Sequence, residues 1–322
     1  MSESRTMTST RLQSRQRVDT VSPGETPIRV RLRRLGSVLG AAFYELRKSR
    51  TASIGGIMIA CLLVMVLFGQ SIATHDPEKA DYRKRTQPPS AEHIMGTDKY
   101  GRDIYSRVII GGQRTIIISF AAVTVGLLIG IPLGICSGFY GGRLDSVVMR
   151  ITDGFLAFPG LLLYLLIVTL AREWKLQGLL NDAILVMALG LAFWPEVARL
   201  SRSTALVEAK KEYVEAARVI GLPGFRIAMT EILPNCLSPM IVNATVRLGL
   251  MILIIAALSF LGLGTSPPTP DWGSDLRAAQ EFLQTHPLIA IFPGLAICIS
   301  VLAFNLFGDG LRDILDPRLA ER

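Results

Sequence analysis

The sequence contains no Gly-Lys dipeptide anywhere in its 322 residues. A phosphate-binding loop of the Gly-x-x-x-x-Gly-Lys-Ser/Thr type is therefore absent. The Gly-x-Ser-x-Gly motif that presents a nucleophilic serine is absent as well. We therefore expect no enzyme activity in this chain, and any work driven by ATP must use an ATPase on separate subunits.

Charged residues are also scarce, because they make up only 19% of the chain, whereas soluble domains are usually closer to about 25%. Hydrophobic residues make up 50%, and the mean hydropathy is +0.42. The net charge of +8 does not indicate a nucleic-acid partner, because 11 of the 34 Lys and Arg residues lie in residues 1–50 and most others lie between apolar runs. This composition indicates a membrane protein in contact with lipid.

Cysteine and histidine are rare and scattered. They are Cys61, Cys136, Cys236, Cys298, His75, His93 and His286. No two of them stand at the spacing of metal ligands, and the histidines are expected to lie in loops without forming a cluster. The sequence therefore predicts no metal site and no cofactor.

Six apolar runs are long enough to be candidate membrane-spanning helices. They cover Ser53–Ile72, Thr115–Phe139, Ile151–Ala171, Ala183–Val197, Leu237–Leu261 and Leu288–Phe307. Backbone polar groups cannot stay unpaired in lipid, so these runs must be helices. The predicted fold is an all-α, polytopic membrane helix bundle with six transmembrane helices.

The distribution of basic residues predicts the orientation of the bundle. With the N-terminus inside, the cytoplasmic segments hold 22 Lys and Arg residues and the external segments hold 11, with Arg247 inside a span. The positive-inside rule then predicts that both termini are cytoplasmic. The predicted organisation is a partly disordered tail (1–50), a first helix with an external loop (51–112), a five-helix core (113–310) and a C-terminal tail (311–322).

The connection between the fourth and fifth runs is expected to be cytoplasmic. Strong helix formers fill Thr204–Ile220 and Gly221 ends that helix, while Pro223 suits the first turn of a second short helix that reaches Pro234. Two short helices joined at a glycine between two spans would form a rigid coupling loop over residues 204–234. The alternative is an amphipathic segment lying on the membrane surface.

A sequence motif within this segment carries a family resemblance. Glu215-Ala216-Ala217, Gly221 and the pair Leu233-Pro234 stand at the spacing of the EAA loop in permeases of binding-protein-dependent ABC importers. Glu231 departs from the isoleucine of that motif. The resemblance implies that this loop docks into a groove on a cytoplasmic ATPase.

Three further stretches resemble the C-type permease subunit of the dipeptide/oligopeptide/nickel class. They are His93–Arg107, Leu258–Gly273 and Phe292–Arg318. The resemblance implies the type I ABC importer permease fold in the inner membrane, with peptides as the leading substrate class. It also implies a homologous B-type permease, two ATP-binding subunits and an external solute-binding protein as partners. The competing interpretation is a secondary transporter or channel that needs no ATPase.

The stretch before the second run is a candidate external site. It contains Gly96, Thr97, Asp98, Gly101, Arg102 and Asp103. Thr97 or Asp98 could cap the helix that follows, and Asp98–Arg102 and Asp103–Arg107 are spaced for ion pairs. This helix is expected either to brace the bundle or to dock a solute-binding protein.

Two further features are candidates for function. Arg247 lies within a predicted span, with Asn243 one turn earlier, and both could line the pathway. Arg247 could instead pair with a partner subunit, Asp145 or Asp153. The proline-rich loop before Gly273 carries Trp272, which could anchor at the membrane interface, or the loop could act in gating or docking.

Overall fold

The computed structural model describes residues 49–172, 179–264 and 268–315, so residues 1–48 of the predicted tail 1–50 and residues 316–322 of the predicted tail 311–322 lie outside the described residues. The described residues form helices joined by loops, with one isolated β-bridge between Thr97 and Asp103. The α-helices are α3 (Arg50–Ile72), α4 (Ile104–Tyr140), α5 (Gly142–Leu156), α6 (Gly160–Arg172), α7 (Leu179–Glu208), α8 (Glu212–Val219), α9 (Gly224–Arg226), α10 (Leu233–Leu258), α11 (Trp272–Ala279) and α12 (Leu288–Leu315). π-Helical turns cover Ile227–Ile232 and Ser259–Leu263, and 3₁₀ turns cover Tyr82–Lys84 and Gln280–Phe282.

Within the described residues, five stretches are long and apolar enough to cross a membrane. They are Arg50–Ile72, Ile104–Tyr140, Asp182–Glu208, Gly224–Leu263 and Leu288–Ile314. They confirm five of the six predicted runs, most of them with longer bounds than the sequence predicted. The largest extension at one end is in Gly224–Leu263, which begins 13 residues before Leu237, and α4 begins eleven residues before Thr115 because Asp103 caps it there.

The third predicted span, Ile151–Ala171, is wrong as a single straight helix. The chain instead forms α5 and α6, which are bent by 92° at the break between them. Pro159 explains the break, because proline disfavours helical geometry at the residue before it and has no amide hydrogen to donate. The pair counts as a sixth span only if the bent helices are taken together.

The coupling loop also differs from the prediction at both ends. Its first helix does not begin at Thr204, because α7 continues to Glu208 and α8 begins only at Glu212. The carboxylate of Glu208 holds the intervening turn by accepting bonds from Lys211 Nζ and Tyr213 Oη, each at 2.7 Å.

The second predicted short helix does not stop at Pro234 but runs without interruption into the membrane span. Proline cannot donate an amide bond, and the chain accommodates it with the π-helical turn Ile227–Ile232. There the Leu233 amide donates to the Ala228 carbonyl, five residues back. The second half of the loop, from Gly224 onward, is therefore continuous with α10. Together they form the 40-residue helical stretch Gly224–Leu263.

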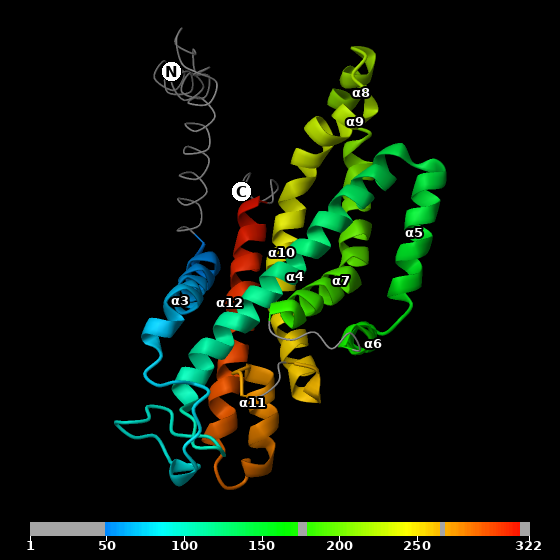
Figure 1. Cartoon of the computed structure of the whole chain (residues 1–322). Coiled ribbons are helices and arrows are strands. Elements are labelled where there is room, and N and C mark those ends of the chain that lie inside the picture. The colour runs from blue at the N-terminus through cyan, green and yellow to red at the C-terminus, as the bar shows by residue number, and fades with distance from the viewer. Residues whose placement is uncertain (1–48, 173–178, 265–267, 316–322) are drawn as a thin grey trace, which may run out of the picture. The chain divides into compact units, whose positions relative to one another are not determined.

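The packing of α4 against α7 forms the centre of the bundle (Figure 1). Gly126, Gly130, Gly134 and Gly138 recur every four residues on one side of α4. A Cβ atom at these positions would lie between 2.3 and 2.7 Å from atoms of Phe193, Val197, Ala198 and Arg202 on α7. Small residues at this spacing let two membrane helices approach closely, a signal that the sequence analysis did not use.

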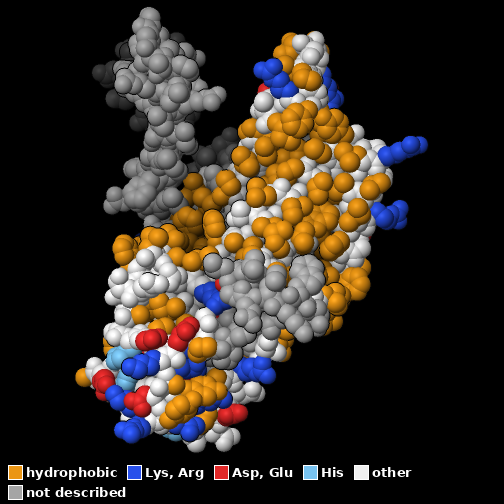
Figure 2. Space-filling model, viewed as in Figure 1, with side chains coloured by type: hydrophobic (Ala, Val, Ile, Leu, Met, Phe, Trp, Pro, Cys, Tyr) orange, Lys and Arg blue, Asp and Glu red, His pale blue; other side chains and the backbone are white. Residues whose placement is uncertain are grey.

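Large apolar side chains cover the outer faces of the long helices. Leu67 on α3 and Leu128 on α4 are about 70% exposed. Figure 2 shows hydrophobic side chains over the middle of one face, with charged side chains gathered at the end formed by residues 73–103 and α11. A soluble protein would not expose apolar surface on this scale, so lipid is the medium these faces fit.

Candidate functional site

Three polar or exposed regions contain the residues singled out from the sequence: the coupling loop, a pocket between the central helices, and residues 73–103 before α4. We call residues 73–103 the external segment, after the side of the membrane on which the sequence predicts them. At the coupling loop, α8 and α9 project at one end of the described helices (Figure 1). The apolar side chains Val219, Ile220 and Phe225 are 87%, 74% and 66% exposed there. We call these three residues the tip. Arg218 and Arg226 are exposed beside it, so the tip is apolar with a basic rim.

Gly221 ends α8 in a left-handed conformation. Its φ is +81°, and the Leu222 and Gly221 amides donate to the Ala217 and Arg218 carbonyls, which is the hydrogen-bond pattern of a Schellman motif. No atom of the described part of the chain, beyond Gly221 and its two neighbours, lies within 4 Å of a Cβ placed on Gly221. Glycine is therefore favoured here by backbone conformation and not by lack of space.

The inner face of α8 is packed into a small apolar core shared with three other helices. Its buried members are Ile135, Ala205, Val214, Ala217, Ile227, Ala228, Ile232 and Cys236. Val214 is fully buried, and Tyr213 donates to Glu208 while accepting from Asn235 Nδ2. Burial first, and then the Glu208 carboxylate, raise the pKa of Tyr213, so its hydroxyl stays a donor. The loop is thus fastened to α4, α7 and α10.

The predicted coupling residues divide between this core and the solvent-facing side. Ala217 is buried and Leu233 packs on the core, whereas Glu215, Ala216 and Pro234 are exposed. The motif therefore presents Glu215 and Ala216 outward, while Ala217 and Leu233 pack against the core beneath them.

A polar pocket opens between the central helices and contains both predicted pathway residues. It has a volume of about 500 Å³ and is lined by Leu156, Glu196, Arg199, Leu200, Ser203, Asn243 and Arg247. The Nη2 atom of Arg247 lies 2.7 Å from Oε2 of Glu196 on α7. The predicted pairing of Arg247 with Asp145 or Asp153 is wrong, because those carboxylates pair with Arg202 and Arg199.

Glu196 is the pocket residue that the sequence analysis missed. It stands next to Pro195, one position from the end of the predicted run Ala183–Val197, and so looked like a boundary residue. Since α7 continues to Glu208, Glu196 lies in the middle of a long helix. The sequence feature that could have identified Glu196 as a candidate is its acidic side chain one position before the end of an apolar run.

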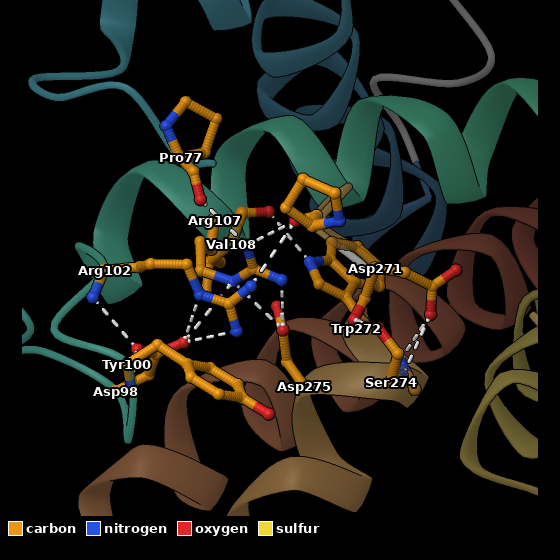
Figure 3. A network of polar contacts seen from close by, with 12 residues as sticks. Pro77, Asp98, Tyr100, Arg102, Arg107, Val108, Asp271, Trp272, Ser274 and Asp275 are labelled. Carbon is orange, nitrogen blue, oxygen red and sulfur yellow. Dashed lines mark hydrogen bonds and ion pairs between the residues drawn. The ribbon is translucent and has the colours of Figure 1, made fainter. Parts of the chain in front are cut away.

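The external segment forms a buried ion-pair network with α11 (Figure 3). Arg102 Nη2 lies 2.6 Å from Asp98 Oδ2, as the spacing predicted. The predicted pair of Asp103 with Arg107 is wrong, because Arg107 Nη2 lies 2.6 Å from Oδ1 of Asp275. Burial raises the pKa of the Asp275 carboxyl, and the nearby Arg107 guanidinium opposes that shift.

The cap of α4 also differs from the prediction. Asp103, and not Thr97 or Asp98, accepts the Ser106 amide at 2.8 Å and acts as the N-cap. Thr97 accepts from the Gln87 amide at 2.9 Å and Asp98 accepts from the amides of Tyr100 and Arg102.

The two motif glycines sit where a side chain would clash. Gly96 and Gly101 have φ values of +77° and +76°, and a Cβ on them would lie 2.4 and 1.7 Å from a backbone carbonyl oxygen. The segment is therefore a folded loop held against α4 and α11, an arrangement that favours the bracing role.

Trp272 is buried inside the protein, where its ring cannot contact a membrane interface. It is 1% exposed, and its Nε1 donates to the Val108 carbonyl of α4 at 2.8 Å. The predicted interfacial anchor is therefore wrong, because the ring fills the space beside Gly112.

The expectation that the histidines form no cluster is wrong for two of them. The ring centroids of His75 and His93 lie 4.7 Å apart, with Glu92 beside them. His75 follows α3 and His93 precedes α4, so only the folded external segment brings them together.

Comparisons with known proteins agree with this architecture. The chain matches the family described as binding-protein-dependent transport system inner membrane component over residues 130–321. It also matches the N-terminal TM domain of oligopeptide transport permease C over residues 37–89. A structure of the methionine ABC transporter MetNI in an inward-facing conformation has a similar fold. Its TM-score is 0.54 at 20% identity, covering 65% of this chain and 96% of that chain.

Several curated relatives align along most of their length. The dipeptide transport system permease protein DppC of Alkalihalophilus pseudofirmus is 39% identical over 278 residues, which cover 86% of this chain and 89% of the relative. The glutathione transport system permease protein GsiD of Pectobacterium atrosepticum is 39% identical, with 84% and 88% covered. The di/tripeptide transport system permease protein DppC of Pseudomonas aeruginosa is 38% identical, with 86% and 91% covered.

These matches favour the importer over a transporter or channel that acts without an ATPase. A permease of this kind works with ATPase subunits, further membrane subunits and a binding protein, and it performs no hydrolysis itself. The matched regions together span both the first helix and the helical core. The chain therefore belongs to the binding-protein-dependent transport system inner membrane components, and it is a multi-pass permease subunit of an ABC importer.

Proposed function

We propose that this permease moves small peptides across the inner membrane and that residues 204–234 couple it to a cytoplasmic ATPase. Both termini then face the cytoplasm. The observation that carries the proposal is the tip of Val219, Ile220 and Phe225, because three strongly exposed apolar side chains on a fixed helical loop are suited to binding a partner.

The coupling step follows from how the loop is connected. A partner that pushes on the tip moves α8, whose inner face shares a core with α4, α7 and α10. Because α9 continues into α10, displacement of the loop becomes tilting of a spanning helix. Two stable positions of this unit, each favoured at a different stage of the ATP cycle, would open the pathway alternately to each side.

The pocket supports a peptide as substrate. Arg247 presents a cation, Glu196 an anion and Asn243 an amide in one open cavity. The carboxylate and ammonium ends of a small peptide complement such a pair. The relatives named for dipeptide, di/tripeptide and glutathione transport are consistent with this substrate class.

We infer the remaining partners from the same features. A homologous B-type permease would close the open side of the pocket, since a single subunit with one bent pair does not enclose a wide path. Two ATP-binding subunits would bind the two coupling loops, and an external solute-binding protein would deliver the peptide.

Cysteine labelling tests the orientation and the coupling role together. In a variant with its four native cysteines replaced, Glu215→Cys should react with a membrane-impermeant maleimide only after permeabilisation and should cross-link to the copurifying ATPase. Tyr82→Cys is the matched control, because Tyr82 is an exposed residue of the external segment. It should react with the same maleimide in intact spheroplasts. Labelling of Glu215→Cys from outside would contradict the proposed orientation and the ATPase contact.

A further inference from the structure

The external segment gathers three side chains with the chemistry of metal ligands. His75 lies three residues after α3, and Glu92 and His93 lie in the loop before α4. One ligand atom from each of the three lies within 4.8 Å of the other two. The proposed transport function assigns no role to any of them.

His93 has one ring nitrogen fixed and the other unused. Its Nδ1 lies 2.9 Å from Oδ1 of Asp103, a carboxylate that is 1% exposed. Its Nε2 is buried and has no hydrogen-bond partner among the residues that the structure describes, and the residue as a whole is 5% exposed. Donation from Nδ1 to the carboxylate places the lone pair on Nε2, and an unpaired buried lone pair is costly unless something binds it.

Asp103 fits the role of an outer-shell partner. Metal-bound histidines usually donate their second ring nitrogen to a carboxylate, which fixes the tautomer and makes the ligand more basic. Ser106 in turn fixes Asp103, because its amide and hydroxyl donate to Oδ2 at 2.8 and 2.7 Å. The Ser106 hydroxyl also accepts the His75 amide at 3.0 Å, so the same network positions both histidines.

His75 and Glu92 supply the more accessible ligands. His75 has a side chain that is 37% exposed, and Thr74 Oγ1 lies 3.0 Å from its Nδ1, which leaves Nε2 as its second nitrogen. Lys84 donates to Oε1 of Glu92, and the carboxylate has a second oxygen.

We propose that His75, Glu92 and His93 bind a divalent transition metal ion of the zinc class. Two imidazoles and one carboxylate suit such an ion better than magnesium or calcium, which prefer all-oxygen sites. Tetrahedral zinc with ligands at about 2.0 Å holds them roughly 3.3 Å apart. Because the three ligand atoms lie up to 4.8 Å apart, the more accessible His75 and Glu92 side chains would close in by up to roughly 1.5 Å around His93.

The bound ion would link the end of α3 to the loop that leads into α4. These two points are separated by the segment 76–91, which has only one short 3₁₀ turn. The proposal depends on neither the substrate nor the orientation of the chain. Its failure would therefore leave the coupling role untouched.

Metal content and cobalt spectroscopy test the site on the full chain, purified in detergent with its copurifying subunits and without a polyhistidine tag. After chelation and return of zinc, the wild type should retain about one ion per chain. Cobalt should give the visible absorption of a tetrahedral site. Zinc should also raise the midpoint of thermal unfolding.

The variants separate the site from adventitious binding. His75→Ala, His93→Asn and Glu92→Gln should each lower zinc affinity, because even loss of an outer-shell partner costs about 10–100-fold. His93→Asn keeps a donor for Asp103 and Glu92→Gln keeps an acceptor for Lys84, so neither should unfold the loop. His286→Ala, on an exposed histidine outside the cluster, is the control and should bind as the wild type does.

Two results would overturn the proposal. The first is a wild-type chain that retains no zinc and shows no tetrahedral cobalt spectrum. The second is zinc binding that is the same in the wild type, the three ligand variants and the His286→Ala control.

Discussion

The guanidinium of Arg107 and the carboxylate of Asp275 form a buried ion pair between residues 168 positions apart in the sequence. Their side chains are 4% and 14% exposed. Arg107 also donates to the Pro77 and Pro268 carbonyls, so one side chain joins the external segment, α4 and the loop before α11 (Figure 3). The start of α4 is therefore fixed by partners on both sides of it.

Removing the carboxylate should destabilise this end of the bundle. Asp275→Ala leaves a buried guanidinium without its closest anion, and loss of one partner of a buried pair costs about 3–5 kcal/mol. The unfolding free energy in detergent should fall by about 3 kcal/mol, the low end of that range, because Asp98 lies 4.0 Å from Arg107 and compensates in part.

Glu281→Gln provides the matched control for that measurement. Glu281 pairs with Lys99 at 3.6 Å, but its side chain is 73% exposed. Exposed pairs of this kind contribute about 0–1 kcal/mol, so the control should change stability little. Equal losses of unfolding free energy in Asp275→Ala and Glu281→Gln would contradict the argument that burial sets the cost of breaking an ion pair.

The glycine series on α4 should not tolerate even a methyl group. A Cβ on Gly134 would lie 2.3 Å from the Ala198 carbonyl oxygen, which is backbone and cannot rotate away. Gly134→Ala must separate α4 from α7 and should cost at least about 1–3 kcal/mol. Thermal unfolding of the purified chain measures this loss.

Gly154→Ala is the control for the glycine series. Nothing lies within 4 Å of a Cβ at Gly154, and its φ is outside the left-handed region. Replacing this glycine in an α-helix should be neutral or slightly stabilising. A Gly134→Ala variant as stable as Gly154→Ala would show that the helices can separate without cost.

Gly221 is predicted to matter for coupling more than for folding. Gly221→Ala places an L-residue at φ +81°, which costs about 1–2 kcal/mol. The strain falls on the turn that sets the direction of the tip. Uptake driven by ATP should therefore decrease while the amount of protein in the membrane stays near normal.

An asparagine at the same position separates conformation from side-chain size. Asparagine adopts the left-handed region more readily than alanine, so Gly221→Asn should recover much of the uptake. ATPase activity measured with uptake in proteoliposomes would show whether hydrolysis continues without transport in Gly221→Ala. Normal uptake in that variant would contradict the coupling role.

The length of the apolar runs was sufficient to predict most of the spans, because a chain in lipid must form helices to pair its backbone polar groups. It did not predict the bend at Pro159, since a hydropathy window averages across a single proline. It also placed the start of α4 too late, because the first turns of that helix are buried by the external segment and carry polar residues such as Arg107.

The candidate site was predicted less completely than the fold. Local spacing indicated the Asp98–Arg102 pair and the turn at Gly221, both of which depend on neighbours in sequence. The partners of Arg247 and Arg107 come from other helices, and no local pattern identifies Glu196 or Asp275 as those partners. The His75–His93 contact was missed for the same reason.

The pair of Arg247 and Glu196 provides a test that separates substrate binding from structure. Either single neutral substitution, Arg247→Gln or Glu196→Gln, leaves one charge unpaired inside a span and should lower stability. The loss should be less than the cost of breaking a fully buried pair, since both side chains are about one-third exposed. Stability alone therefore cannot reveal the role of the pair.

Exchanging the two residues keeps the ion pair but reverses its direction. The double variant Arg247→Glu with Glu196→Arg should recover stability, because the attraction is preserved. It should not recover uptake of peptides, because the carboxylate of the substrate would then face an anion where the wild type presents the guanidinium of Arg247. The exchange of Asp145 and Arg202, an ion pair outside the pocket lining, is the control and should preserve both stability and uptake. Uptake at the wild-type rate by the reversed Arg247–Glu196 pair would show that these residues only hold α7 to α10.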